Sequence, residues 1–181
     1  VGGLLMEIPT RPMPREAPSA RKPVRVAAVV LAAGRSTRMG GPNKLLARFG
    51  NEPLVRRTVE RALASNANRV VVVTGHQADR VEAALAGLDV VFAHNPDFAS
   101  GLSSSLRAGI TALPENVDGA MVMLGDMPEV TQADLDRLIA AFAGSAGAMV
   151  ARATHDGKRG NPLIIPRRMF ADVALLKGDT G

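Results

Sequence analysis

The sequence predicts an α/β fold, in which a mostly parallel, Rossmann-like sheet has helices on both faces. Two observations support this prediction. Short runs of aliphatic, often β-branched residues alternate with longer stretches whose apolar residues recur at helical spacing. The strongest runs are apolar at every position, which is typical of strands buried on both faces. Because neighbouring parallel strands need a crossover connection, this alternation indicates right-handed βαβ units.

The expected elements follow one another from residue 26 onward. The strands are expected at VAAVVLA (26–32), RVVVVTG (69–75), DVVFA (89–93), AMVML (120–124) and AMVARA (148–153). Four apolar stripes predict helices within residues 54–63, 81–88, 106–113 and 135–142. Thr131 and Asp134 precede the last stripe with the spacing of a helix N-cap and its capping-box acid. In such sheets, ligands bind beyond the carboxyl ends of the strands.

Composition limits the classes of function. The 181 residues suffice for one domain, which we expect over residues 25–181. The absence of cysteine excludes disulfides, thiolate metal sites and a cysteine nucleophile. No Trp or Tyr is present, and residues 1–25 carry +3 of the net charge of +5, so a nucleic-acid partner is not expected.

The first 24 residues differ from the remainder. They are rich in Pro and Arg and lack apolar periodicity, so we expect a disordered or loosely packed tail. No apolar run reaches the about 18 residues of a membrane span, so no membrane partner is expected. These features favour a cytoplasmic protein.

Three of the expected strands are followed by segments whose residues could bind a ligand. They are LAAGRSTRMGGPNK (31–44), TGHQ (74–77) and GDMP (125–128). The first segment fits neither G-x-x-x-x-G-K-[ST] nor G-x-G-x-x-G. Its glycines still allow backbone N–H groups to form an anion-binding concavity. Arg38 can fork two phosphate oxygens, and Lys44 offers a point charge. From spacing alone, an ordinary glycine-rich turn with solvated cations remains the alternative.

The segment LAAGRSTRMGGPNKLL resembles the L-A-A-G-x-S-x-R-M-G-x-x-N-K-L-L signature of MobA-like nucleotidyltransferases. It is closest to the branch that makes the cytosine-dinucleotide form of the molybdenum cofactor, the molybdenum cofactor cytidylyltransferases. TGHQ, NPDFASGLSSSLRAGI, GDMPEV, GNP and the terminal GDTG follow in the family's order. The resemblance implies a fold of the nucleotide-diphospho-sugar transferase type. Because the family continues beyond GDTG, it also implies that the nucleotidyltransferase domain at 25–181 is incomplete at its C-terminus.

The resemblance implies roles for individual residues. Arg38, Lys44 and Asp126 would be catalytic, with the two cations neutralising the triphosphate. Asp126 and Asp179 would bind Mg²⁺, with Mn²⁺ as an alternative, since Mg²⁺ takes few protein oxygens and shares its shell with phosphate and water. From the residues alone, Asp126 could instead be a helix N-cap or a turn residue. The nucleotide-binding set would comprise Leu31, Ala32, Ala33, Gly34, Arg38, Lys44, Asn95, Gly101 and Ser105.

The resemblance also implies residues that bind the acceptor substrate. His76, Asn161 and Pro162 would bind the acceptor substrate. The alternative for His76 is a polar surface residue, since the three histidines lack metal-ligand spacing. The alternative for the serines at 103–105 is helix capping.

The implied reaction is transfer of CMP from CTP to the phosphate of molybdopterin cofactor, with release of pyrophosphate. Related guanylyltransferases carry L-A-G-G, so the methyl group of Ala33 is expected to narrow the pocket against a purine and to favour CTP over GTP. One alternative is a nucleotidyltransferase acting on a sugar or polyol phosphate. Another is a non-catalytic, nucleotide-binding cofactor chaperone. A molybdoenzyme that accepts the product is a further expected partner.

Overall fold

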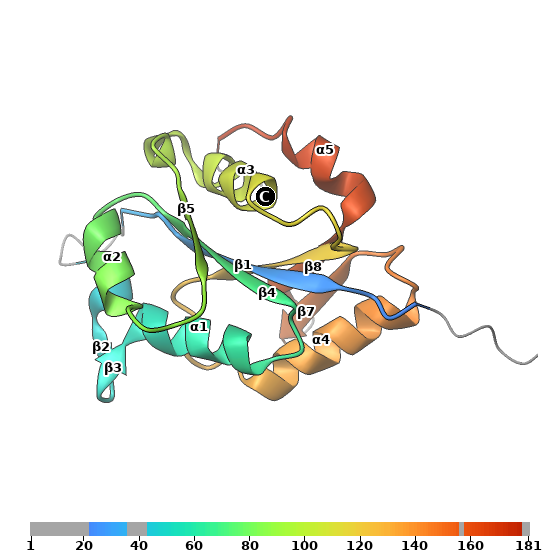
Figure 1. The fold of residues 1–181 in the computed structure, drawn as a ribbon, viewed down its shortest axis with the longest axis horizontal. Coiled ribbons are helices and arrows are strands. Elements are labelled where there is room, and N and C mark those ends of the chain that lie inside the picture. The colour runs from blue at the N-terminus through green and yellow to red at the C-terminus, as the bar shows by residue number, and fades with distance from the viewer. Residues whose placement is uncertain (1–21, 36–42, 156–157, 179–181) are drawn as a thin grey trace, which may run out of the picture.

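The computed structural model describes residues 22–35, 43–155 and 158–178, and a six-stranded sheet lies at its centre (Figure 1). The strand order is β5-β4-β1-β6-β8-β7. Strands β5, β4, β1 and β6 are parallel, whereas β8 runs antiparallel to both β6 and β7. The predicted mostly parallel α/β sheet is therefore confirmed. The strands are β1 (Val26–Ala32), β4 (Arg69–Thr74), β5 (Val91–His94), β6 (Gly119–Leu124), β7 (Ala151–His155) and β8 (Lys158–Pro166).

Helices cover both faces of this sheet, as the sequence predicts. Figure 1 shows α1, α2 and α4 on one face and α3 and α5 on the other. A small hairpin, β2 (Arg48–Phe49) with β3 (Glu52–Pro53), precedes α1. The helices are α1 (Leu54–Ala64), α2 (Ala78–Ala84), α3 (Leu102–Thr111), α4 (Gln132–Gly144) and α5 (Phe170–Val173), with 3₁₀ turns η2 (Lys44–Leu46), η3 (Phe98–Ser100) and η4 (Arg167–Met169).

Strand β1 separates two hydrophobic cores. Alternate side chains of a strand point to opposite faces. Val26, Ala28 and Val30 accordingly pack with α1, α2 and α4, while Val29 and Leu31 pack with α3 and α5. Every residue of β1 is buried, which explains why this strand is apolar throughout. Its carboxyl end is thereby held between two packed layers.

The capping box predicted for α4 is confirmed. Thr131 is the N-cap, and its hydroxyl accepts a hydrogen bond from the Asp134 backbone N–H at 3.2 Å. The Asp134 carboxylate accepts in return from the Thr131 hydroxyl at 2.6 Å and from the Thr131 N–H at 2.9 Å. These bonds, together with Arg137, lower the pKa of Asp134 from 3.8 to about 2.

Some boundaries differ from the prediction. The segment GNP lies inside β8, and neither this strand nor α5 was predicted. Pro162 is tolerated there because the register between β7 and β8 shifts between Arg152 and Thr154, and paired positions resume at Leu163. Helix α2 ends at Ala84 rather than extending to residue 88, and the expected strand at 148–153 begins at Ala151. Within the described ranges, no helix combines the length and the apolar composition needed to cross a bilayer.

Candidate active site

A cavity of about 510 Å³ lies beyond the carboxyl ends of β1 and β6. Three neighbouring segments line it: the loop after β1, the segment from η3 into α3, and the loop after β6. The cavity is therefore at the sheet edge where parallel topology predicts a ligand. Its lining comprises Leu31, Ala33, Gly34, Arg35, Leu45, Phe98, Ala99, Gly101, Leu102, Ser105, Leu124, Gly125 and Asp126.

Lys44 pairs with Asp126, which lines this cavity, although 82 positions separate the two residues. Lys44 itself is not in the described lining. The Lys44 Nζ donates a hydrogen bond to Asp126 Oδ2 at 3.0 Å, and the two side chains are 46% and 33% exposed. Asn43 fixes the backbone next to the lysine, because its Oδ1 accepts from the Leu45 N–H at 3.1 Å and caps η2. The pair remains open to solvent. A carboxylate and an ammonium group are thus both accessible to a charged ligand.

The close approach of β1 and β6 places Asp126. The Gly125 N–H donates to the Leu31 carbonyl at 2.9 Å. A Cβ atom at Gly125 would lie 3.0 Å from the Leu45 Cδ2 and 3.1 Å from that carbonyl oxygen, so a larger residue would push the loops apart. Asp126 is not the N-cap of the following helix, since Thr131 has that position. Its carboxylate is therefore left available at the cavity.

Asn95 supports the cavity from behind. Its side chain is 3% exposed, and its Nδ2 donates to Ser104 Oγ at 2.9 Å and to Ser105 Oγ at 3.0 Å. Ser105 lines the cavity, whereas Asn95 does not. Gly101, at φ 105°, is the N-cap of α3, and the serines lie within the helix. The capping alternative for the serines is therefore wrong.

Phe98 lies between the loops that follow β1 and β4. The Arg35 guanidinium carbon is 5.2 Å from the centroid of its ring. The His76 ring centroid is 5.9 Å away at an interplanar angle of 49°. The backbone N–H of His76 also donates a hydrogen bond to the backbone carbonyl of Ala33 at 3.1 Å. His76 is absent from the described lining of this cavity, so it contacts the site through Phe98 and Ala33.

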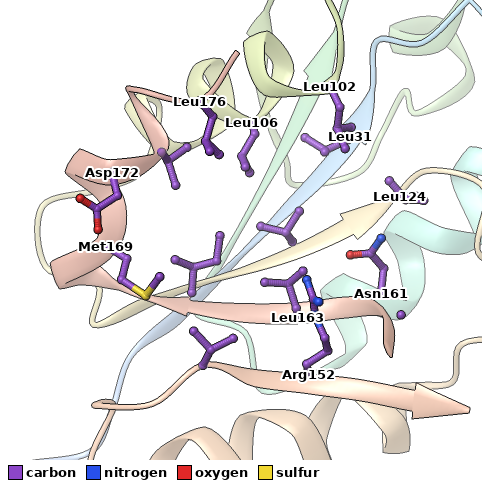
Figure 2. A pocket seen from close by; sticks show the side chains of 15 residues that line it. Leu31, Leu102, Leu106, Leu124, Arg152, Asn161, Leu163, Met169, Asp172 and Leu176 are labelled. Carbon is purple, nitrogen blue, oxygen red and sulfur yellow. The ribbon is translucent and has the colours of Figure 1, made fainter. Parts of the chain in front are cut away.

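A second cavity, of about 710 Å³, adjoins the first and shares Leu31, Leu102 and Leu124 with it. It lies between the sheet and helices α3 and α5 and is mostly apolar (Figure 2). Figure 2 shows Asn161 and Arg152 projecting into it from β8 and β7. Pro162 instead lines a separate hollow beside α4. The structure therefore brings Asn161, but not Pro162 or His76, to this cavity.

Residues 28–181 match the family model described as the MobA-like NTP transferase domain. The chain belongs to this family. The resemblance inferred from the motifs is thereby confirmed at the level of the family. The family model does not distinguish the molybdenum cofactor branch from the other members of the family.

The chain is also similar in sequence to curated proteins. Bifunctional protein GlmU of Kineococcus radiotolerans is 37% identical over 129 residues, which are 70% of this chain and 26% of that protein. The chain thus spans about a quarter of the length of the curated relatives it matches.

Solved structures give the same fold. The crystal structure of the Rv0371c homologue from Mycobacterium sp. strain JC1 has a TM-score of 0.75 and 31% identity, covering 87% of this chain and 77% of that one. Rv0371c of Mycobacterium tuberculosis H37Rv in complex with manganese has a TM-score of 0.68 and 28% identity, covering 86% and 78%. A nucleotidyl transferase from Methanothermobacter thermautotroptrophicus has a TM-score of 0.72 and 29% identity, covering 86% of this chain and 78% of that one. The fold is therefore that of known nucleotidyltransferases of the nucleotide-diphospho-sugar transferase type.

The structure describes only some of the basic side chains and metal ligands predicted for this MobA-like domain. Arg38 and Asp179 lie outside the described residues, so their roles stay predictions. Among the described residues, no three His, Cys, Asp or Glu side chains gather closely enough to hold a metal ion. Asp126 alone still fits Mg²⁺, because this ion is often held by one or two carboxylates and completed by phosphate oxygens and water.

Sequence reasoning assigned no individual role to Phe98 or to Arg35. The contact between their side chains depends on the packing of loops that are far apart in the sequence. The one signal in the sequence that could have indicated a role for Phe98 was its position inside NPDFASG, which resembles a motif of the family.

Proposed function

We propose that this chain catalyses the Mg²⁺-dependent transfer of CMP from CTP to the phosphate of molybdopterin cofactor, with release of pyrophosphate. The observation that carries the proposal is the meeting of Lys44 and Asp126 at a cavity bordered by the end of β1. A cation beside a carboxylate at a strand edge suits a triphosphate and its metal ion. Family membership supports nucleotidyl transfer, and the resemblance of the motifs supports CTP and the acceptor.

In the proposed reaction, a phosphate oxygen of the acceptor attacks the α-phosphorus of CTP. The new P–O bond forms as the bond to the β-phosphate oxygen breaks, and pyrophosphate leaves with the electron pair. Lys44 and Arg38 would balance the charge on the triphosphate. Asp126, with Asp179, would hold Mg²⁺ or Mn²⁺, which supplies further neutralisation of the phosphates. No general base is required, because the attacking phosphate is already anionic near neutral pH.

The first cavity would hold the nucleotide. Leu31, Ala33 and Gly34, which line it, would border the base, and the Ser105 hydroxyl would face it. Ala32, predicted with them, is buried in the core on the other face of β1 and is not in the described lining, so it would act only by positioning its neighbours. Asn95 would act indirectly, because its amide group holds the Ser105 hydroxyl. Gly101 would begin the helix on which that serine lies. In this arrangement, residues of β1 and α3 would contact the base, and charged residues in the loops after β1 and β6 would bind the triphosphate and its metal ion.

The second cavity would hold the acceptor. Its volume of about 710 Å³ is within the range of small-molecule sites. Asn161 offers an amide group inside a mostly apolar lining, which suits a heterocyclic acceptor. Because the two cavities share three leucines, an acceptor in one would lie next to a nucleotide in the other. His76 and Pro162 would contribute from outside this lining, and a molybdoenzyme would take the product.

Incubation with CTP, Mg²⁺ and molybdopterin cofactor tests the proposal. Mass spectrometry should detect a cytidylylated product, and pyrophosphate should appear in equal amount. Turnover with a sugar or polyol phosphate but not with molybdopterin would support the other acceptor class. Nucleotide binding without pyrophosphate release would support a chaperone.

An Asp126→Asn variant tests the metal site independently of turnover. It keeps the shape of the side chain and removes its charge, so Mn²⁺ binding measured by titration calorimetry in the presence of CTP should weaken. Asp172→Asn is the matched control, because Asp172 lies on α5 and lines only the second of the two cavities. Unchanged Mn²⁺ binding in Asp126→Asn would remove Asp126 from the proposed metal site.

A further inference from the structure

Phe98 is the one aromatic side chain among the described residues that line the nucleotide cavity of about 510 Å³. It opens η3, between β5 and α3, and is half-buried. Its ring has the Arg35 guanidinium group 5.2 Å away and the His76 ring 5.9 Å away. The Phe98 ring therefore lies against side chains from two separate loops.

Gly75 and Ala33 limit how far Phe98 can retreat. A Cβ atom at Gly75 would lie 2.7 Å from the Phe98 Cβ and 2.8 Å from the Ala33 Cβ, which is closer than such atoms approach. The three residues therefore meet at one tightly packed point. Movement of the Phe98 Cβ toward Gly75 or Ala33 would displace the backbone at Gly75 or the methyl group of Ala33.

Ala33 itself has little surface to offer a base. It is 2% exposed, and its methyl group lies beside the position at Gly75 that also meets Phe98. A substitution at Ala33 would therefore change the cavity mainly by changing the position of the phenylalanine. The preference for a pyrimidine that the sequence assigns to Ala33 would be carried out by another side chain.

We infer that Phe98 is a specificity-determining residue that limits the size of the nucleobase, and that Gly75 and Ala33 are positioning residues that hold its ring in place. The inference rests on the proposed function, since it takes the cavity to be the nucleotide site. A single-ring base leaves Phe98 where it is. A purine needs the ring to move, and the packing at Gly75 opposes that movement.

Binding of CTP and GTP with Mg²⁺ to wild type, Phe98→Ala and Phe98→Leu tests this inference. Wild type should prefer CTP, and Phe98→Ala should reduce the ratio of the two affinities roughly tenfold, which is the scale of discrimination by apolar pocket contacts. Phe98→Leu keeps an apolar side chain and serves if the alanine variant unfolds, as judged by circular dichroism. The matched control is Phe49→Ala. Phe49 is 43% exposed and has the Arg57 guanidinium group 5.1 Å from its ring, but it is not part of the described cavity lining.

A double variant tests the positioning role. Gly75→Ala should change the ratio of the CTP and GTP affinities, because the new methyl group meets the Phe98 Cβ at 2.7 Å and the Ala33 Cβ at 2.8 Å and must shift the ring. The Phe98→Ala background keeps both Cβ atoms, so the same backbone adjustment occurs there, but no ring is left to shift. The ratio should therefore change only where Phe98 is present. An equal change of the ratio in both backgrounds would mean that Gly75 acts independently of the Phe98 ring and would overturn this role.

The outcomes separate the inference from the proposed function. Wild type that binds no nucleotide would remove the proposed function and the inference with it. Wild type that binds CTP and GTP equally, or a folded Phe98→Ala protein that keeps the wild-type preference, would overturn the inference alone. A reduced preference in Phe98→Ala with an unchanged preference in Phe49→Ala would support it.

Discussion

Lys44→Ala should separate the contribution of this side chain to folding from its contribution to catalysis. Its Nζ is 3.0 Å from Asp126 Oδ2, but both side chains are substantially exposed. In water, two unit charges at this separation attract by about 1.4 kcal/mol, and ordering two side chains leaves an exposed pair worth less than about 1 kcal/mol. The free energy of unfolding should fall by no more than this, which lowers the melting temperature by at most roughly 4 °C.

The expected effect on the reaction is larger. A hydrogen bond from an ammonium group to a phosphate oxygen contributes about 1.5–3 kcal/mol. If Lys44 makes this bond in the transition state, its loss should lower kcat/KM for CTP roughly 10- to 150-fold. The assay is continuous detection of pyrophosphate in the presence of CTP, Mg²⁺ and the acceptor.

Lys22→Ala is the matched control for this experiment. Lys22 is exposed and precedes the amino end of β1, at the opposite edge of the sheet from the cavity. Its removal should leave kcat/KM unchanged. A Lys44→Ala protein with wild-type kcat/KM would refute the catalytic role, and a fall of several kcal/mol in stability would refute the assumption that solvent screens the pair.

Three further changes test the fold. Asn95→Ala should lower the free energy of unfolding by about 2–3 kcal/mol in urea, because the two serine hydroxyls and the backbone N–H that bond to the buried amide group lose those bonds; an unchanged midpoint would contradict this. Gly109→Ala should cost about 1–3 kcal/mol, since its methyl group would lie 2.3 Å from a valine methyl of β1, whereas Gly144→Ala, with nothing within 4 Å, should not destabilise. The folded-state pKa of Asp134 is lowered to about 2, chiefly by the Thr131 hydroxyl, so its stabilisation is complete above about pH 4 and is lost as the pH falls toward 2. The stability difference between wild type and Asp134→Asn should shrink over this interval, and a constant difference would contradict the assignment.

Periodicity predicted the central part of the fold well. The expected strand at 26–32 coincides with β1, because a parallel strand buried on both faces must be apolar at every position. Helix α2 was expected to be longer, since Leu85 and Leu88 continue its apolar stripe. Leu85 is indeed buried, but the chain leaves the helix there and turns at Gly87 with φ 84°. An apolar stripe thus predicts which side chains are buried without fixing where the helix ends.

The candidate site was predictable where it depended on topology. Lys44 and Asp126 follow different strands, and the parallel pairing of Leu31 with Leu124 brings those strand ends together. The contacts of Phe98 and the bonds of Asn95 could not be predicted in this way. They depend on the side-chain packing of loops and helix starts, for which the sequence has no periodic signal.

The double-sided burial of β1 has a consequence for how the site responds to damage. Its amides are paired on both sides, with β4 and β6, so they should exchange with solvent hydrogen only when the whole sheet opens. The edge strand β5, half of whose residues are exposed, should exchange through smaller fluctuations. Leu31, which lines both cavities, belongs to the strand that should open only when the whole protein unfolds. Substitutions in either core that do not touch Phe98, Ala33 or Gly75 should therefore reduce the amount of folded protein while leaving the base preference of the surviving molecules intact.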